Sequence, residues 1–169
     1  GLRSGLRAGG ALMGRPVEVV RSSIVAAPRE QVWARVVSVE GVAHEFGPLL
    51  TMRFPAELRG RSIAEVPRGR PLGRAWILVG GLVPVEFDDL VLADLRVPRF
   101  FQERSALGSC RVWEHRRELE QLPDDTTRVT DTLRAEPRAL LPAAVVRLVV
   151  GAVFAHRHRR LARWFGPAD

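Results

Sequence analysis

Residues 111–120, with the sequence RVWEHRRELE, decide the fold because their apolar and polar side chains alternate. A period of two residues is typical of a β-strand with one face turned toward a core. One face carries Trp113, His115, Arg117 and Leu119, and the other carries Val112, Glu114, Arg116, Glu118 and Glu120. The face with tryptophan and leucine is the better candidate for the interior, so a histidine and an arginine are expected to point inward.

The following segment, residues 127–136, alternates in the same way and places Val129, Asp131, Leu133 and Ala135 on one face. The turn LPDDTT at residues 122–127 is typical of a β-hairpin. Because the apolar faces of both strands must lie on one side of the sheet, only alternate registers are allowed. One allowed register places Arg117 opposite Asp131, and another places His115 opposite Asp131.

Asp131 gains a basic neighbour in either register, and three interpretations of this pair stay open. Structural pairing is the simplest, since opposite charges across strands stabilise a sheet by a few tenths of a kcal/mol to about 1 kcal/mol. Contact with a ligand is the second. The third is acid/base catalysis, in which Asp131 orients His115 as a base or hydrogen-bond donor.

The rest of the chain predicts helices at both ends of a run of strands. Residues 17–26 are expected to form a strand, and APREQVWARVV (27–37) a helix whose inner face carries Val32, Trp33, Val36 and Val37. A second short helix or turn is expected at residues 39–46. Further strands are predicted near residues 49–54, 74–80, 84–95, 98–106, 111–121 and 127–136. Short connections make this sheet antiparallel, so the fold class is α+β.

Two other segments complete the order of elements. Residues 55–73 are rich in proline, glycine and arginine and are expected to form a loop or flap. After Pro137, a spacing of three or four residues predicts one long helix, with Pro142 in its first turn. The apolar stripe expected on this helix is Leu141, Val145, Leu148, Ala152 and Ala155. Arg147 interrupts its apolar part, which is shorter than the ~20 residues of a membrane-spanning helix, so no integral membrane segment is expected.

Composition narrows the classes of function. The chain has 169 residues with a formal net charge of +7, and every basic residue is arginine. These arginines are scattered among 19 acidic residues without a recognisable binding motif, so no nucleic-acid role is expected. Cys110 is the only cysteine, which excludes an internal disulfide and favours a reducing cytoplasm. We expect a flexible N-terminal tail at residues 1–15 and a single domain at residues 16–166.

The order of these segments resembles a known family. The segments that carry the resemblance are APREQVW (27–33), FDDL (87–90), FFQERSALGSCRVWEHRRELE (100–120), TRVTDTLRAEP (127–137) and FAHRHRRLARWF (154–165). Together they are similar to the ligand-binding branch of the SRPBCC superfamily, the START-like proteins related to polyketide cyclases and dehydrases. This resemblance covers roughly residues 17–165 and implies a helix-grip fold, in which a curved antiparallel sheet wraps around a long C-terminal helix. It also implies an apolar cavity for lipids, polyketides or other hydrophobic small molecules.

Candidate ligand-binding residues follow from the faces of the predicted strands. They are Trp76, Arg104, Trp113, His115, Arg117 and Asp131, and both tryptophans are also plausible as simple core. Adjacent residues on a strand face opposite sides, so only one member of each pair, Glu103/Arg104 and Asp88/Asp89, can face a cavity. The register that decides between them is not fixed by the sequence.

Other kinds of site find no support in the sequence. His156 and His158 are two residues apart on a helix, which does not suit a shared metal ligand set, so no metal or cofactor is expected. The sequence has no G-x-S-x-G motif and no glycine-rich phosphate loop. No catalytic residue can be assigned.

Three hypotheses for the function follow. The first is binding of a hydrophobic small molecule, lipid- or polyketide-like, between the sheet and the last helix. The alternative is an aromatase/cyclase or dehydratase-type enzyme that uses His115, Arg117 or Asp131 in that cavity. The third is an interaction or membrane-surface module that uses the arginine-rich end of the last helix, with Trp164 and Phe165 as an interfacial anchor.

Overall fold

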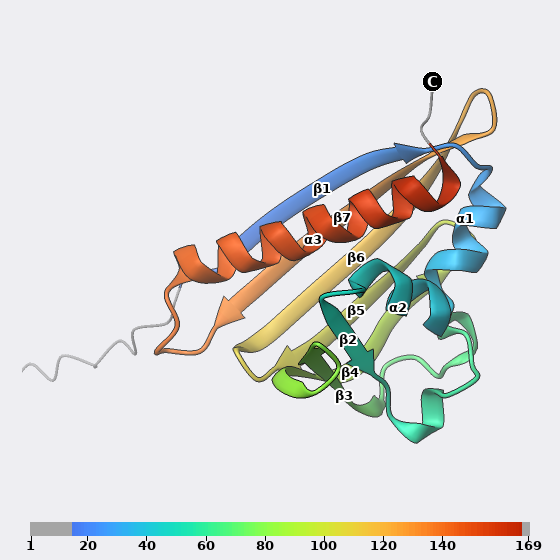
Figure 1. Ribbon diagram of the computed structural model, residues 1–169. Coiled ribbons are helices and arrows are strands. Elements are labelled where there is room, and N and C mark those ends of the chain that lie inside the picture. The colour runs from blue at the N-terminus through green and yellow to red at the C-terminus, as the bar shows by residue number, and fades with distance from the viewer. Residues whose placement is uncertain (1–14, 167–169) are drawn as a thin grey trace, which may run out of the picture.

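The computed structural model describes residues 15–166 and shows an α+β fold with one seven-stranded antiparallel sheet (Figure 1). The strands are β1 (Val17–Val25), β2 (Leu50–Arg53), β3 (Pro71–Val79), β4 (Val83–Arg96), β5 (Phe100–Leu107), β6 (Cys110–Leu122) and β7 (Thr126–Pro137). Their order across the sheet is β1-β7-β6-β5-β4-β3-β2. All predicted strands are therefore present, and β1 is brought back beside the last strand.

Two short helices follow β1 in the sequence, and one long helix follows β7. They are α1 (Arg29–Val36), α2 (Val39–Phe46) and α3 (Ala143–Phe165). Ser38 begins α2 as its N-cap, because its hydroxyl accepts a hydrogen bond from the Gly41 amide at 2.9 Å. The proline-rich segment predicted as a flap contains two 3₁₀ turns, η1 (Ala56–Leu58) and η2 (Ile63–Glu65), and β3 begins before its end.

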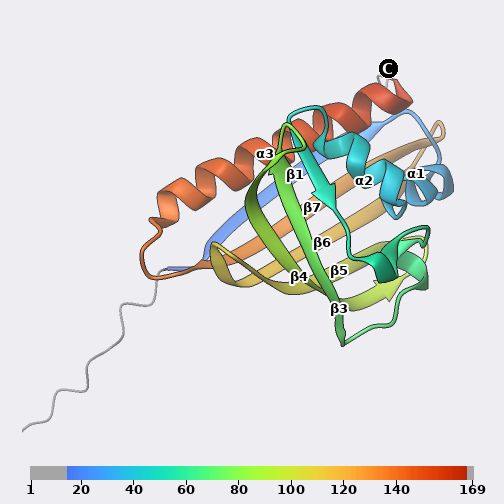
Figure 2. The same ribbon diagram turned by 60° about the horizontal axis from the view of Figure 1, so that its bottom comes forward.

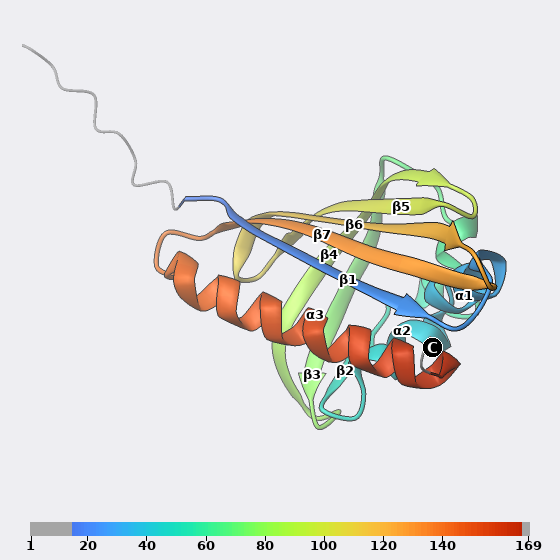
Figure 3. The ribbon, with the colours of Figure 1, turned by 90° about the horizontal axis from the view of Figure 1, so that it is seen from above.

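The sheet curls into a half-barrel, and α3 lies along its concave side, where it packs on β1 and β7 (Figures 2 and 3). Irregularities in the β3–β4 and β4–β5 pairings accompany this curl, as expected for bulges that increase local twist. The short helices α1 and α2 close one end of the half-barrel (Figure 1). This arrangement is the helix-grip fold that the order of elements implied.

The β6–β7 hairpin has the first of the two registers allowed by its sequence. Arg117 lies opposite Asp131, whereas His115 lies opposite Leu133. The side chains expected to face inward are all buried: Trp113, His115, Arg117 and Leu119 on β6, and Val129, Asp131, Leu133 and Ala135 on β7. The alternation in the sequence therefore identified the interior face of both strands.

The apolar core has two parts along the half-barrel. One part packs α1 and α2 against the sheet, and the predicted inner face of α1 is buried there, including Trp33 in edge contact with Phe101. The other part packs α3 against β6 and β7 and includes Trp113 and Phe154. The space between these two parts is where the cavity described below lies.

The buried face predicted for α3 is wrong. Leu148 is 74% exposed and Ala152 is also exposed, whereas Val146, Phe154 and Leu161 are buried. The first half of this helix is apolar on nearly every side, so a spacing of three or four residues fits several faces equally well. The buried stripe also contains Arg157 and His158, which an apolar pattern cannot reveal.

The boundaries near the N-terminus differ from those predicted. Pro28 was expected inside the first helix, but it is the N-cap and α1 begins at Arg29. The expected tail at residues 1–15 lies, apart from Arg15, outside the described residues.

Candidate functional site

A cavity of about 500 Å³ lies between the concave face of the sheet and α3. This volume lies within the range of small-molecule sites, which is about 300–1,000 Å³. Most of its wall is apolar and comes from α2, the strands β2 to β6 and α3, including Val42 and Phe46 of α2, Phe101 of β5, and Val146, Val150 and Phe154 of α3. The cavity is therefore enclosed by elements that are distant in the sequence.

The mouth of the cavity is identified by the lining residues that remain exposed. Val85 of β4 and Val145 and Val149 of α3 are 56%, 46% and 54% exposed. The opening thus lies between β4 and the first half of α3. Both of its sides are apolar.

Five acidic or basic side chains lie on this apolar wall. They are Glu86 and Asp88 on β4, Glu103 on β5, His115 on β6 and Arg157 on α3. Glu103 and His115 face each other across the β5–β6 pair, and the Nδ1 atom of His115 is 3.9 Å from a carboxylate oxygen of Glu103. Three neighbouring strands therefore present polar groups to one region of the cavity.

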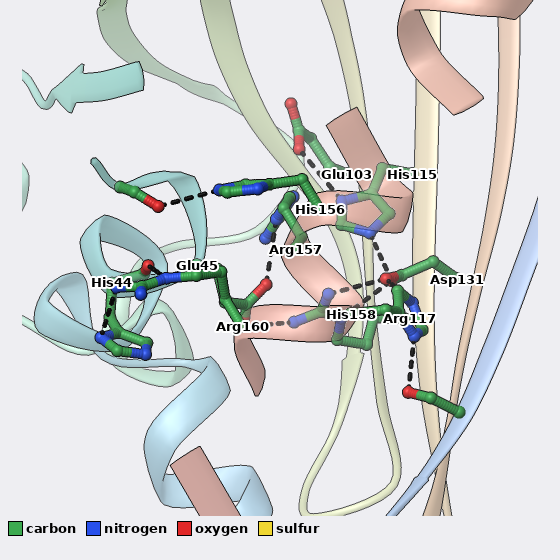
Figure 4. A network of polar contacts seen from close by, with 12 residues as sticks. His44, Glu45, Glu103, His115, Arg117, Asp131, His156, Arg157, His158 and Arg160 are labelled. Carbon is green, nitrogen blue, oxygen red and sulfur yellow. Dashed lines mark hydrogen bonds and ion pairs between the residues drawn. The ribbon is translucent and has the colours of Figure 1, made fainter. Parts of the chain in front are cut away.

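Asp131 anchors a network of polar contacts behind this wall (Figure 4). Its Oδ1 atom is 2.7 Å from His115 Nε2 and accepts a hydrogen bond from Arg117 Nε at 2.8 Å. Its Oδ2 atom accepts from Arg117 Nη2 at 2.6 Å and is 2.8 Å from His158 Nε2. One carboxylate thus holds side chains of β6 and α3 against β7.

Glu45 of α2 is the second carboxylate of this network. Its two oxygens accept hydrogen bonds from Arg117 Nη1 at 2.7 Å and from Arg157 Nε at 3.0 Å. The guanidinium of Arg157 also lies over the rings of Phe46 and Phe154. Arg117 therefore joins the two carboxylates, and the network ties α2, the sheet and α3 together.

The network sets the charges of these buried groups. Burial opposes ionisation of Asp131, but Arg117, His115 and their hydrogen bonds outweigh it and hold the pKa of this carboxyl well below its usual value. Burial likewise opposes ionisation of Glu45, and Arg117 and Arg157 still lower its pKa. Burial disfavours the charged form of Arg117, yet Asp131 and Glu45 raise its pKa. The contacts with Arg117 thus favour the ionised forms of Asp131 and Glu45 although both carboxylates are buried.

Asp88 and Glu103 form a different kind of pair. Burial first, and then the neighbouring Glu103 carboxylate, raise the pKa of Asp88 well above its ordinary value. Burial also acts on Glu103, but interactions with His115 and Asp88 outweigh it and lower the pKa of Glu103. Burial and the neighbouring carboxylate therefore favour the neutral form of Asp88, whereas the neighbours of Glu103 favour its ionised form.

The structure divides the six predicted ligand-binding residues into three groups. Trp113 and His115 line the cavity. Arg117 and Asp131 are fully buried behind the wall, in the network. Trp76 and Arg104 do not line the cavity, so the expectation that they do is corrected.

The reason for this correction is the register of the sheet. Trp76 is 40% exposed on the outer face, where its ring contacts Phe87. Arg104 also points outward and pairs with Glu114. Its neighbour Glu103 faces the cavity instead, as Asp88 does where Asp89 points outward to Arg74.

Sequence reasoning missed Glu45, Arg157 and His158. Glu45 lies beside the apolar residues of α2, and the two α3 residues lie within an arginine-rich run that reads as a solvated helix end. His158 was considered only for metal binding. The one usable signal was the pair of inward-facing basic residues expected on β6, His115 and Arg117, which need buried acidic partners.

The sequence also raised the questions of a metal site, a membrane-spanning segment and a membrane anchor. Within residues 15–166, no group of histidine, cysteine or acidic side chains has an arrangement that suits a metal ion. None of the helices in this range combines the length and the apolar character needed to cross a bilayer. Trp164, a proposed membrane anchor, is in contact with Arg35 and His44 of the short helices.

Solved structures with the same arrangement of elements include proteins of several bacteria. A Chromobacterium violaceum protein is 10% identical with a TM-score of 0.69, and the match covers 90% of this chain and 99% of that protein. A START superfamily protein from Mycobacterium smegmatis is 16% identical with a TM-score of 0.64, over 88% and 96% of the two chains. The Zhui aromatase/cyclase from Streptomyces sp. R1128 is 16% identical with a TM-score of 0.65, over 89% and 93%. At such identities the likeness shows a shared fold and leaves the function open.

Sequence comparisons give one family. The family model described as "Domain of unknown function (DUF8410)" matches residues 23–165. No curated protein matches the chain.

Proposed function

The chain belongs to the DUF8410 family and has the START-like helix-grip fold of the SRPBCC superfamily, and from this premise we propose that it binds a hydrophobic small molecule in the cavity between the sheet and α3. The ligand is lipid- or polyketide-like in character. The observation that carries this proposal is the apolar cavity of about 500 Å³.

The energetic argument rests on the apolar wall. Burying apolar surface contributes roughly 25 cal/mol per Å² removed from water. Valine, leucine and phenylalanine side chains from α2, the sheet and α3 surround the space, so an apolar ligand removes both its own surface and the wall from water. The mouth at Val85, Val145 and Val149 gives such a molecule a route that never passes the ion network.

Native mass spectrometry of gently purified protein, followed by organic extraction, tests this function. A discrete added mass that extraction removes is the expected result, and the extract identifies the class of ligand. The extracted protein should also bind the neutral fluorescent probe N-phenyl-1-naphthylamine with saturable one-to-one stoichiometry. A protein that carries no added mass and does not bind the probe would contradict the proposal.

An acid/base enzyme of the aromatase/cyclase or dehydratase type is the second candidate. The observation in its favour is His115, whose ring lies on the cavity wall with Glu103 on one side and Asp131 on the other. An imidazole held in this way is typical of a general acid or base. Incubation with a β-hydroxyacyl thioester tests this candidate, because dehydration appears as the mass of one water lost. His115→Gln should abolish that loss while probe binding persists.

A further inference from the structure

The Asp88 side chain differs from every other polar group on the cavity wall. It is 4% exposed, and its Oδ1 atom has no hydrogen-bond partner. Among residues 15–166, the other buried side-chain atoms without partners are the Nε atoms of Arg29 and Arg35, which do not line the cavity. Asp88 Oδ1 is therefore the one unpartnered buried polar atom that this part of the chain places on the cavity wall.

Its neighbours are committed to other contacts. The Ser105 hydroxyl donates to Glu103 Oε1 at 2.8 Å and accepts from the Val91 amide at 3.1 Å. The other carboxylate oxygen of Glu103 faces His115 Nδ1 at 3.9 Å. Asp88 Oδ1 thus remains a buried acceptor without a donor, which is destabilising.

We propose that Asp88 is a polar anchor in the cavity, which accepts a hydrogen bond from a hydroxyl group of an otherwise apolar ligand. This proposal rests on the binding function proposed above and names the chemical class of its ligand, a hydrophobic alcohol. The hydroxyl binds at the sheet wall, beside Glu103 and His115. Asp88 lies three residues after Val85, a residue of the mouth, along β4.

A hydroxyl fits this position better than a carboxylate does. An anionic group here would stand beside the Asp88–Glu103 pair, and like charges repel strongly where water is excluded. Arg157, the cationic residue on the wall, already donates its Nε to Glu45 and lies against two phenylalanine rings. The carboxyl pair would attract an ammonium group, but this group would have to lose its hydration shell in a cavity whose remaining wall is mostly apolar.

A matched series of pyrene probes tests the anchor. The probes are 1-pyrenemethanol, 1-methylpyrene, 1-pyrenecarboxylate and 1-pyrenemethylamine, titrated by fluorescence into the extracted protein. The readout is the ratio of the dissociation constants of 1-methylpyrene and 1-pyrenemethanol, compared between variants so that the different hydration of the two probes cancels. Asp88→Leu should lower this ratio about tenfold, and Asp88→Asn, which keeps an oxygen acceptor, should preserve it.

Asp89→Asn is the matched control. Asp89 is next to Asp88 on β4 but does not line the cavity and pairs with Arg74 at 2.7 Å, so this variant should leave the ratio unchanged. If Asp88→Leu does not fold, Asp88→Ala replaces it. An unchanged ratio in the apolar variant, or tighter binding of the amine or the carboxylate than of the alcohol to the unsubstituted protein, would overturn the anchor. Failure of all four probes to bind would instead contradict the binding function itself.

Discussion

The guanidinium of Arg117 and the carboxylate of Asp131 face each other across β6 and β7 and form a two-point ion pair, with N–O distances of 2.8 and 2.6 Å. Both side chains are fully buried. Pairs of this kind contribute little net stability relative to apolar residues, but removing one partner leaves an uncompensated charge in the interior. The stability of this fold is therefore sensitive to the loss of either residue.

Asp131→Ala should lower the free energy of unfolding by about 3–5 kcal/mol, because it leaves Arg117 buried without this partner. Urea denaturation measures the change. The control is Glu114→Ala, which removes the partner of the exposed Arg104 and should cost less than about 1 kcal/mol. Similar losses of stability in the two variants would show that burial does not raise the cost of leaving Arg117 without this partner.

Acid should destabilise the fold through Asp131 and Glu45. Their pKa values are lower in the folded protein than the ordinary 3.8 and 4.5, so their stabilisation is complete above those values and is lost as pH falls through the folded values. The free energy of unfolding should therefore decrease as pH falls below about 4. Denaturation at several pH values checks this, and Glu45→Gln should show a shallower decrease. An equally steep decrease in that variant would exclude Glu45 as a cause.

Asp88 should have the opposite pH dependence. Its pKa is higher in the folded protein than the ordinary 3.8, so the stability that it contributes is complete below that value and is lost as pH rises toward the folded value. Asp88→Asn should therefore gain stability relative to the unsubstituted protein when the pH is raised from about 4 to 7. Asp89→Asn, a change at the adjacent outward-facing residue, serves as the control and should show no such gain.

Val149→Trp should weaken binding of N-phenyl-1-naphthylamine at least tenfold, because the larger side chain obstructs the mouth of the cavity. The matched control is Leu148→Trp. Leu148 precedes Val149 on the same helix and is exposed, but it does not line the cavity. Equal weakening by both substitutions would place the entrance elsewhere or show that the helix itself had been disturbed.

Trp113→Ala should destabilise the fold by about 3–5 kcal/mol and weaken probe binding, since Trp113 is buried in the core and also lines the cavity. Trp76→Ala should leave probe binding unchanged, because this tryptophan lies on the outer face.

His115→Ala should affect ligand binding or turnover more than Trp113→Ala does, relative to its effect on stability. Equal losses of stability with no effect on binding in either cavity variant would favour a purely structural role for both residues.

Much of the fold was predictable because β6 and β7 alternate strictly. Their periodicity identified the interior face, and the hairpin limited the register, so the proximity of His115, Arg117 and Asp131 followed from the sequence. The connection between β5 and β6 gave no such limit, so the sequence left open whether Glu103 or the candidate Arg104 faces the cavity. A shift of one residue on a strand moves a side chain to the other face.

The buried polar groups of the helices were beyond the reach of pattern analysis. Glu45, Arg157 and His158 are buried because each has partners on other elements, and those partners are distant in the sequence. A charged residue on a helix ordinarily indicates solvent. Only the complete arrangement of α2, β6, β7 and α3 shows that these charges balance one another.

Few residues belong to both the ion network and the apolar lining of the cavity. The pocket can therefore change among related chains while the network is kept. Substitutions at lining residues outside the network, such as Val149 or Val150, reshape the pocket without cutting a contact of Asp131 or Glu45. A new selectivity can therefore be reached in single steps that leave the ion network intact. The same property makes this protein a suitable starting point for the redesign of a receptor for a chosen apolar compound.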